Sequence, residues 1–324
     1  MSATIIRPTT ARDLQPLRWF LARAFGTDLS APFLNPALMC WKYWNGRSDW
    51  TGPRSFVVEK HGRITAHVGI WPVIMKLGRT IITGAQMIDW AATREHPASA
   101  VASLIYLADS YTFLYAIGGS AATRKILPAF GFREIGRQWR GIFVPGWRSA
   151  GDAGSECEAL LDTKQWACEP STPTGIQTFT LPDGSNSPWF PRSPAFIEYL
   201  YRCPTARFQA YTVACAGEAK AYVISSIVKR QARVVGMWVR RQTDLDGLAA
   251  YCLVKRVLAL TPEVRSVVVT APHSSHMVES AVAAGFQLVR SVPVQFFQTS
   301  DTFHPSPDFH FQMVDDDGSF LSFI

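Results

Sequence analysis

The sequence contains no run of about 18 or more apolar residues, the length that a membrane-spanning helix needs. Its start, Met1-Ser2-Ala3-Thr4, lacks the charged-then-apolar pattern of a signal peptide, so we expect a cytoplasmic protein. It also lacks a Cys-x-x-Cys pair, which argues against a zinc site and against a disulfide framework, and we expect no metal. The six cysteines are scattered along the chain, at Cys40, Cys157, Cys168, Cys203, Cys215 and Cys252.

Charge of one sign is only mildly in excess. The chain has 32 basic and 25 acidic residues among 324, a net charge of +7. This balance would suit an anionic ligand such as coenzyme A or RNA, but it is modest for the length, and no dense basic helix of the kind that binds tRNA stands out. The triplet Asp315-Asp316-Asp317 beside Gly318 favours a solvated turn over a cation site.

The composition that remains, 48% hydrophobic and 18% charged residues, is typical of a packed globular protein of about two domains. Residues 87–132 organise the chain. A strand over Met87–Ala92 leads through a short helix to a second strand over Phe113–Ile117, which breaks at Gly118-Gly119, where glycine adopts a positive φ at no cost. Ser120 predicts the N-cap of a helix that ends before Gly131. A capped helix after a strand leaves N–H groups facing outward, which suits a phosphate or a carbonyl oxygen.

This order of elements resembles the C-terminal half of the GCN5-related N-acetyltransferase (GNAT) fold. Residues 5–14, with the apolar positions that follow, resemble the first strand and first helix of that family, and residues 55–68 resemble its central hairpin. The resemblance covers about the first 145 residues, and it depends on the order of short segments. It implies an α+β fold, in which helices flank a twisted mixed sheet, and an acyltransferase with acyl-CoA as co-substrate and a small-molecule acceptor.

Three segments recur in the same order at offsets of 154 to 158 residues, which indicates an internal duplication. The pairs are Pro36 and Pro194 before an aromatic helix, His61-Gly62 and Ala216-Gly217 in a turn, and Ser120–Phe132 and Ser274–Phe286 at the closing helix. The sequence therefore predicts two tandem GNAT-like domains. We expect an N-terminal domain over 1–145, a linker over 146–190 with one strand at 176–181, a degenerate C-terminal domain over 191–300 and a tail over 301–324.

The acyl-CoA site is the part of the resemblance that the residues support least. Members of the family carry an Arg/Gln-x-x-Gly-x-Gly/Ala loop, because small residues let backbone amides approach the pyrophosphate. The corresponding segment here, residues 93–103, has small side chains from Ala98 to Ser103 but contains no glycine. The resemblance predicts that acyl-CoA contacts come from Ala91, Ser99, Ala100, Val101 and Ala102, and from Gly118, Gly119, Ser120 and Arg124.

The family's usual general acid is also missing. A tyrosine often lies four residues before the closing glycine, but Leu127 occupies that position here. Asp89 could act as a general base through water, His96 could accept a proton from an amine, and Tyr115 could act as an acid. Each also has a structural interpretation, as a hydrogen-bonded strand residue, a surface histidine and a core aromatic respectively. His67 is a second histidine open to both interpretations.

Three functions remain open. The first is a CoA-dependent acyltransferase acting on an amine or hydroxyl, and the segments 41–44 and 67–73 resemble GNAT relatives of bacterial surface-polysaccharide pathways, which suggests an amino sugar. The second is a FemABX-like aminoacyl-tRNA-dependent transferase, which needs no CoA loop and would be the one case with a nucleic-acid partner. The third is a non-catalytic GNAT-like binding protein. We expect an acyltransferase, and we expect the N-terminal copy to be the active one because its Gly-Gly-Ser turn, first strand and first helix survive.

Overall fold

The computed structural model describes residues 4–77, 79–146, 157, 159, 161, 165–179, 190–239, 244–272 and 276–298. These residues divide into two compact units. Unit 1 holds residues 4–76, 80–133 and 295–298, and unit 2 holds 77, 79 and the described residues from 134 to 294. Unit 1 therefore takes a segment from far along the chain, and unit 2 begins before residue 145, where the sequence analysis ends the first domain.

Unit 1 follows the expected order of elements. Its helices and strands are β1 (Ile5–Pro8), α1 (Leu14–Phe25), α2 (Pro36–Met39), the π-helical turn η3 (Cys40–Trp44), β2 (Ser55–Lys60), β3 (Arg63–Leu77), β4 (Thr80–Ala92), α3 (Pro97–Ser110), β5 (Phe113–Ile117), α4 (Ala121–Ile126) and the 3-10 helix η4 (Leu127–Phe130), with short 3-10 turns at η1 (Ala11–Asp13) and η2 (Pro32–Leu34). Its strands lie in the order β1-β2-β3-β4-β5. β1 and β3 are antiparallel to β2, whereas β4 and β5 are parallel.

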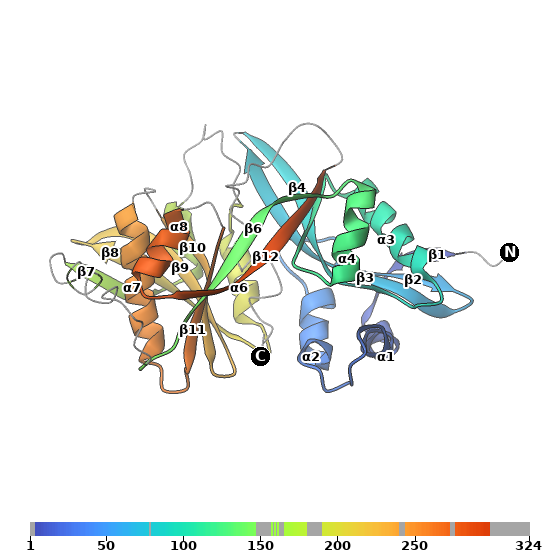
Figure 1. Cartoon of the computed structure of the whole chain (residues 1–324), viewed down its shortest axis with the longest axis horizontal. Helices are drawn as coiled ribbons and strands as arrows, with labels where there is room; N and C mark the ends of the chain where they lie inside the picture. The colour runs from blue at the N-terminus through green and yellow to red at the C-terminus, as the bar shows by residue number, and fades with distance from the viewer. Residues whose placement is uncertain are drawn as a thin grey trace. The chain divides into compact units, whose positions relative to one another are not determined.

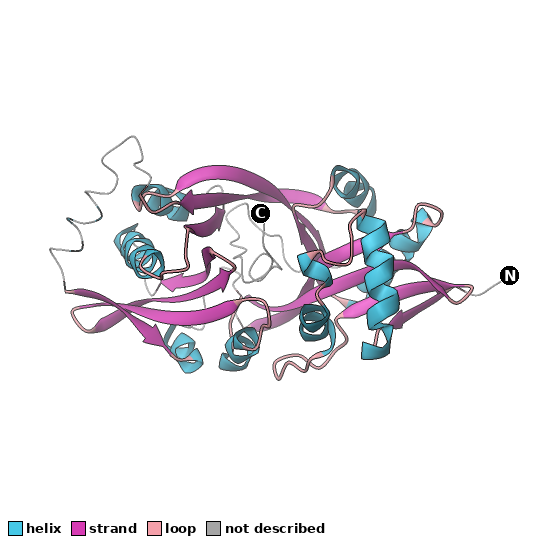
Figure 2. Ribbon diagram, turned by 90° about the horizontal axis from the view of Figure 1, so that it is seen from below, coloured by secondary structure: helices cyan, strands magenta, loops and turns pink. Residues whose placement is uncertain are grey.

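Helices cover both faces of the unit 1 sheet (Figures 1 and 2). On one face, α3 contributes Leu104 and Leu107 to a core with Val68, Ala85 and Leu114 from the strands. On the other face, the α1 and α2 region packs against residues of β2 and β4 in a second core. Because side chains alternate along a strand, these two cores assign each strand residue to one face or the other.

The helix cap and the glycine turns lie where the sequence predicts them. Ser120 accepts a hydrogen bond from the backbone N–H of Thr123, so it caps α4. Gly118, Gly119 and Gly131 all have positive φ, of 77°, 84° and 83°. At the β2–β3 turn His61 and Gly62 both have positive φ, a pattern typical of a two-residue hairpin loop.

Unit 2 repeats much of this plan. Its elements are β6 (Arg133–Phe143), β7 (Trp166–Ser171), the 3-10 helix η5 (Pro173–Phe179), α6 (Pro194–Tyr201), β8 (Arg207–Cys215), β9 (Glu218–Val228), β10 (Gln231–Val239), α7 (Asp244–Ala259), β11 (Ser266–Pro272), α8 (His276–Ala283) and β12 (Gln287–Gln298). The strands lie in the order β6-β11-β10-β9-β8-β7. β10 and β11 are parallel, as β4 and β5 are.

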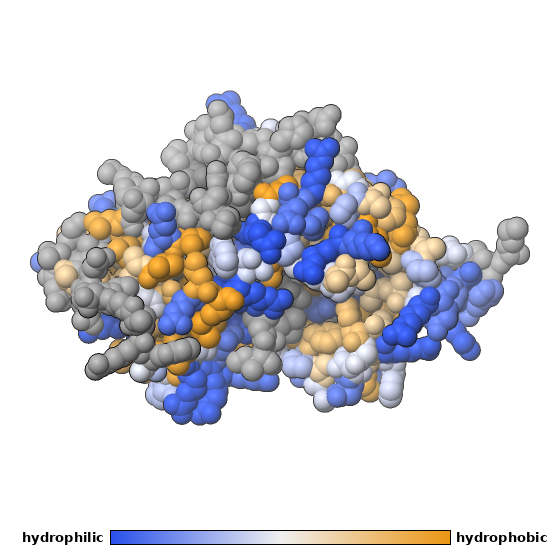
Figure 3. All heavy atoms as spheres, in the orientation of Figure 1, coloured by the Kyte–Doolittle hydropathy of each residue, from blue (hydrophilic) through white to orange (hydrophobic). Residues whose placement is uncertain are grey.

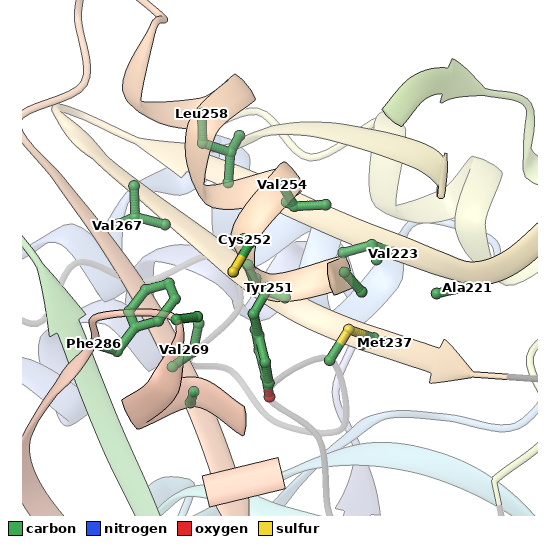
Figure 4. Packing of buried hydrophobic residues seen from close by; sticks show 14 of the residues in the cluster. Ala221, Val223, Met237, Tyr251, Cys252, Val254, Leu258, Val267, Val269 and Phe286 are labelled. Carbon is green, nitrogen blue, oxygen red and sulfur yellow. The ribbon is translucent and has the colours of Figure 1, made fainter. Parts of the chain in front are cut away.

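The core of unit 2 lies between α7, α8 and the sheet (Figure 4). Tyr251 and Val254 of α7 meet Val223 of β9 and Val267 of β11 there, with Phe286 at the edge of the cluster. Tyr251 is buried, and burial raises the pKa of its hydroxyl. Positions that alternate along β9 and β11 supply this core, which is the pattern of a sheet with one face packed on helices.

The last strand of each copy lies mostly or in part in the other unit. β6 follows unit 1 in the sequence, yet it belongs to unit 2, where it is antiparallel to β11. The end of β12, from Gln295 on, belongs to unit 1. Phe297 stacks on Phe132 at 5.2 Å in unit 1, and Phe143 meets Phe286 at 6.2 Å in unit 2. Phe286 lies 154 residues after Phe132, and Phe297 lies 154 residues after Phe143. The two pairs are therefore counterparts and support the predicted duplication.

Three expectations from the sequence need correction. The strand expected at 176–181 is wrong over residues 176–179, which form η5 instead. The range expected to be a linker contains β7, which pairs with β8 and so completes the unit 2 sheet as β1 completes that of unit 1. Cys157 forms a disulfide with Cys252 of α7, and a separation of 95 residues gave no spacing signal for it. The tail and its acidic triplet lie outside the described residues.

Among the described residues, no helix is long and apolar enough to cross a membrane. On the face that Figure 3 shows, apolar residues lie among hydrophilic ones. Exposed apolar side chains include Trp19 of α1, Ile105 of α3 and Leu260 after α7. Single exposed apolar residues of this kind are normal on globular proteins and indicate no particular partner.

Candidate functional site

β4 and β5, the last two strands in the unit 1 order, separate part of the way along their length. They pair in parallel from Gly84 and Phe113 to Gln86 and Tyr115, and the pairing ends at that rung. β4 continues for six residues beyond it, to Ala92, and β5 continues to Ile117. Two neighbouring strands that part in this way leave backbone groups of both facing the space between them. The parted ends lead to α3 on one side and to the Gly118-Gly119 turn on the other.

The rung at which the strands part has polar side chains within a buried environment. Ala85 and Met87 pack in the α3-side core, so Gln86 between them lies on the opposite face. Tyr115 lies on that same face, since its neighbours Leu114 and Ala116 are also in the α3-side core. Gln86 is 3% exposed and Tyr115 is fully buried. Among the described residues, the Gln86 side-chain oxygen Oε1 has no hydrogen-bond partner.

Asp89, the predicted base, forms a bulge in β4. Its φ is +49°, in the left-handed region that residues other than glycine rarely adopt. Ile88 packs in the α1 and α2 core, and the Asp89 carboxylate also points to that side, where its Oδ2 accepts hydrogen bonds from Lys42 Nζ and Tyr43 Oη. Lys42 is fully buried and the Asp89 side chain is 8% exposed. The bulge therefore turns two consecutive side chains to one face.

The charge of Lys42 decides the ionisation of Asp89. Burial disfavours the carboxylate most strongly, but the Lys42 ammonium and the hydrogen bonds from Lys42 and Tyr43 outweigh it and lower the pKa of Asp89 below its usual value. A general base works best when its pKa lies near the operating pH. A carboxylate with a lowered pKa and two donors on one oxygen is a weak base, so this geometry favours the structural interpretation of Asp89.

His67 belongs to a buried chain of hydrogen bonds on the same face. Its Nδ1 lies 2.9 Å from the Asp89 carbonyl oxygen, which can only accept, so Nδ1 carries the proton. Its Nε2 lies 2.9 Å from Ser55 Oγ and therefore accepts. Thr9 Oγ1 donates to Ser55 Oγ at 2.7 Å, and Trp44 Nε1 donates to Thr9 Oγ1 at 2.9 Å. These hydrogen bonds hold His67 in its neutral form. Burial is the largest cause of its pKa shift and lowers the pKa of His67 to about 4.

His96 lies where α3 begins. It occupies the N-cap position, its Nδ1 lies 3.2 Å from Thr93 Oγ1, and its carbonyl oxygen accepts from the Ser99 N–H. Pro97 follows at the first helical position and has no N–H, so the first turn offers one donor fewer than a glycine loop would. His96 is half-buried, whereas the Asp89 side chain is 8% exposed and Tyr115 is fully buried.

The predicted acyl-CoA contacts divide by accessibility. Ser99 is buried and its Oγ accepts from Thr65 Oγ1, while the Ala100 carbonyl accepts from Trp90 Nε1. The residues that are half-buried are Ala91, Ala100, Val101, Ala102 and Gly118, and those that are exposed are Gly119, Ser120 and Arg124. The structure brings all of them to the ends of β4 and β5 and to the two helices that follow these strands.

Two large side chains near the parted strands lie on the α3 side. The indole of Trp90 donates to the Ala100 carbonyl and to Ser103 Oγ of α3, each at 3.2 Å. Tyr106 of α3 packs against Phe56 of β2, with ring centroids 5.4 Å apart. Both rings therefore make these contacts on the face opposite to Gln86 and Tyr115.

Sequence reasoning missed Lys42, Tyr43 and Gln86. Lys42 and Tyr43 stand in an aromatic segment that gave no hint of an ion pair, because Asp89 lies 47 residues further along the chain. Gln86 stands one residue before the strand that was predicted, and its position became informative only when the end of the β4–β5 pairing was known. Among the described residues no group of three or more His, Cys, Asp or Glu side chains could hold a metal ion.

The last parallel rung of unit 2 differs from that of unit 1 in the face to which its side chains point. β10 and β11 pair from Gln231 and Ser266 to Val234 and Val269, and β10 then bulges before Gly236 and continues to Val239. Val234 and Val269 lie in the core on the α7 and α8 side, whereas Gln86 and Tyr115 lie on the face opposite to α3. Unit 2 therefore keeps the parting of its strands, but these two valines are not the counterparts of Gln86 and Tyr115.

No protein-family model and no curated protein matches the sequence. Solved structures do match. A GCN5-related N-acetyltransferase from Anabaena variabilis ATCC 29413 is 10% identical, with a TM-score of 0.61 over 91% of this chain and 72% of its own. A tandem GNAT protein from the clavulanic acid biosynthesis pathway is 14% identical, with a TM-score of 0.55 over 93% of this chain and 100% of its own.

N-myristoyltransferase from Saccharomyces cerevisiae, solved with bound MyristoylCoA, is 9% identical, with a TM-score of 0.59 over 100% of this chain and 90% of its own. At these identities the likeness shows the fold alone. The chain has the tandem GNAT fold, an α+β architecture in which each unit is a mixed sheet flanked by helices.

Proposed function

We propose that unit 1 transfers an acyl group from acyl-CoA to an amine or hydroxyl acceptor. The observation that carries this proposal is the separation of β4 and β5 beyond the rung of Gln86 and Tyr115. Parted parallel strands can take an extended chain between them and bond it through backbone groups, as a thioester-bearing arm requires. The fold likeness to acyltransferases, one of them solved with MyristoylCoA, supports the proposal.

The residues of unit 1 suggest how such a transfer would proceed. The N–H groups after the Asp89 bulge, including that of Ala91, would polarise the thioester carbonyl. The start of α3 and the Gly118–Ser120 turn would face the phosphates, with Arg124 adding a positive charge. Direct attack by an amine needs no covalent enzyme intermediate, but the amine must lose a proton, and His96 is the accessible group for that step.

The structure also bears on the acceptor. The segment that suggested an amino sugar, residues 41–44, is largely buried: Trp41 packs on Trp71 at 5.8 Å, and Lys42 and Tyr43 bind Asp89. This segment contributes to the core rather than to a binding surface. We therefore keep the proposal at an amine or hydroxyl of a small molecule, with an amino sugar as one candidate to assay.

A ligand screen tests the proposal. The melting temperature of the full chain would be measured with acetyl-CoA, longer acyl-CoAs, free CoA and bulk tRNA. A ligand that binds only the native state stabilises it by about 2.7 kcal/mol at 100 times its Kd, which a thermal scan detects. Stabilisation by acyl-CoA and CoA supports the proposal. Stabilisation by tRNA alone would replace it with aminoacyl transfer, and no response to any ligand would contradict it.

Two matched charge reversals test the predicted phosphate contact. Arg124 and Lys125 are neighbours on α4 and both are exposed, so each change to glutamate alters the net charge equally and should leave folding intact. We expect Arg124→Glu to weaken CoA binding about tenfold or more and Lys125→Glu to weaken it much less. Equal effects of the two changes would show that only long-range charge matters.

A further inference from the structure

The polar atom at the rung where β4 and β5 part indicates which acyl group unit 1 takes. Gln86 is 3% exposed, and among the described residues its Oε1 has no hydrogen-bond partner. A buried acceptor that has lost its water and gained no donor destabilises the fold, and native proteins rarely retain one without a reason. A bound ligand that supplies the donor is such a reason.

The position of Gln86 makes it the end point for a chain that enters between the strands. Such a chain can enter only where the strands are unpaired, and from Gln86 and Tyr115 back to Gly84 and Phe113 they are joined by backbone pairing. The far end of an acyl group would therefore meet this last rung. The thioester would lie nearer to the open ends of β4 and β5.

Aromatic rings close the sheet face behind this rung. The ring of Phe113 lies directly over Gly84, where a Cβ atom would come within 2.2 Å of it. Phe113 stacks on Tyr115 at 6.3 Å and on Phe296 at 5.3 Å, and all three side chains are buried. This stack would limit the length of an acyl chain that reaches Gln86, which favours short acyl groups.

We propose that Gln86 is a specificity-determining residue, which selects a short acyl group carrying a hydrogen-bond donor, such as a hydroxyl, over the unsubstituted acyl group of the same length. This inference rests on the proposed function. The Gln86 carbonyl oxygen accepts from the acyl hydroxyl, and an acyl group without a donor leaves that oxygen desolvated and unpaired. Sites built to bond a polar group discriminate against analogues that lack it for this reason.

Matched four-carbon thioesters test the inference. The Kd of the full chain would be measured by calorimetry for butyryl-CoA, 2-hydroxybutyryl-CoA, 3-hydroxybutyryl-CoA and acetoacetyl-CoA. Acetoacetyl-CoA is polar at the same position as the 3-hydroxy ester but can only accept. We expect at least one hydroxy ester to bind about tenfold more tightly than butyryl-CoA and acetoacetyl-CoA to gain nothing. A gain for acetoacetyl-CoA alone would show that the amide presents its NH₂ group, and would overturn the preference proposed.

Two glutamine variants identify the residue responsible. Gln86→Met keeps the chain length but removes the acceptor, so the preference for the hydroxy ester should disappear while butyryl-CoA binds at least as well. Gln295→Met is the matched control, because Gln295 is also buried with an unpartnered Oε1 among the described residues. Phe296 next to it stacks on Phe113, so Gln295 lies on the other face of the sheet, and its variant should keep the preference.

The outcomes are distinct from those of the proposed function. Gln86→Met replaces an unpaired acceptor with an apolar chain, so it should fold at least as stably as the parent, and Gln86→Leu serves as a second variant if it does not. Equal Kd values for butyryl-CoA and both hydroxy esters in the parent, or a preference that survives both Gln86 variants, would overturn the inference while acyl-CoA binding stands. Failure of every CoA ester to bind would instead contradict the proposed function.

Discussion

Breaking the buried ion pair between Lys42 and Asp89 by removing one partner should strongly destabilise unit 1. Lys42 is fully buried and the Asp89 side chain is 8% exposed, so water cannot solvate either charge well if its partner is removed. Asp89→Ala would leave the Lys42 ammonium buried without its carboxylate. Removing one partner of a buried pair costs about 3–5 kcal/mol, and we expect a loss of that size in the free energy of unfolding.

A double-mutant cycle separates the pair from the cost of a stranded charge. Lys42→Met alone leaves a buried carboxylate and should also cost about 3–5 kcal/mol, but Lys42→Met with Asp89→Ala removes both charges and should recover most of that loss. Tyr43→Phe removes only one hydrogen bond to the carboxylate, worth about 1.5–3 kcal/mol. The four variants would be compared by urea unfolding, followed by tryptophan fluorescence.

Two results would refute this reasoning. If Asp89→Ala lowered the free energy of unfolding by less than about 1 kcal/mol, the carboxylate would not be the partner that Lys42 requires. If the losses of the two single variants simply added in the double variant, the side chains would act independently. The pH dependence of unfolding offers a further check. Because folding lowers the pKa of Asp89, its contribution to the free energy of unfolding is fully present above the ordinary aspartate pKa. That contribution is lost as the pH falls through the lower pKa of the folded state.

Three other perturbations have expected outcomes. The pKa of His67 falls from 6.5 to about 4 on folding, so between these pH values mainly the unfolded chain binds the proton. Acidification from pH 6.5 to 4 should therefore lower the free energy of unfolding by about 3 kcal/mol, as measured by urea unfolding. The His67→Gln variant should lack this pH dependence. Gly84→Ala should destabilise by about 1–3 kcal/mol because its Cβ would overlap the ring of Phe113, whereas Gly46→Ala, with open space around it, should be neutral in the same thermal scan. Gly131→Ala forces a φ of +83° on alanine, and urea unfolding should show a loss of about 1 kcal/mol.

Much of the fold follows from local signals in the sequence. The glycines at 118, 119 and 131 and the cap at Ser120 lie where a positive φ or a side-chain acceptor was predicted, because these requirements involve only neighbouring residues. The order of strand, helix and strand around α3 was also predicted. Ala216 and Gly217 both have positive φ, as His61 and Gly62 do, so the two hairpin turns that the internal repeat paired share this conformation.

What the sequence could not supply depends on contacts between distant segments. No spacing links Lys42 to Asp89, and no pattern within β4 reveals that its pairing with β5 stops at Gln86. The first strand of the second copy, β7, was hidden in a segment of Pro, Gly, Ser and Thr, whose composition predicts a linker. The catalytic and acyl-CoA residues given by resemblance remain predictions, and the contacts of Asp89 argue for a structural role at one of them.

Most of β12, from Gln287 to Val294, belongs to unit 2. Unit 1, however, ends its own sheet with residues that follow unit 2 in the chain, and Phe297 covers Phe132 there. A chain that stopped after unit 1 would lack this strand end and expose the ring of Phe132. We therefore expect the fold of unit 1 to depend on residues 295–298, which the chain supplies only after unit 2.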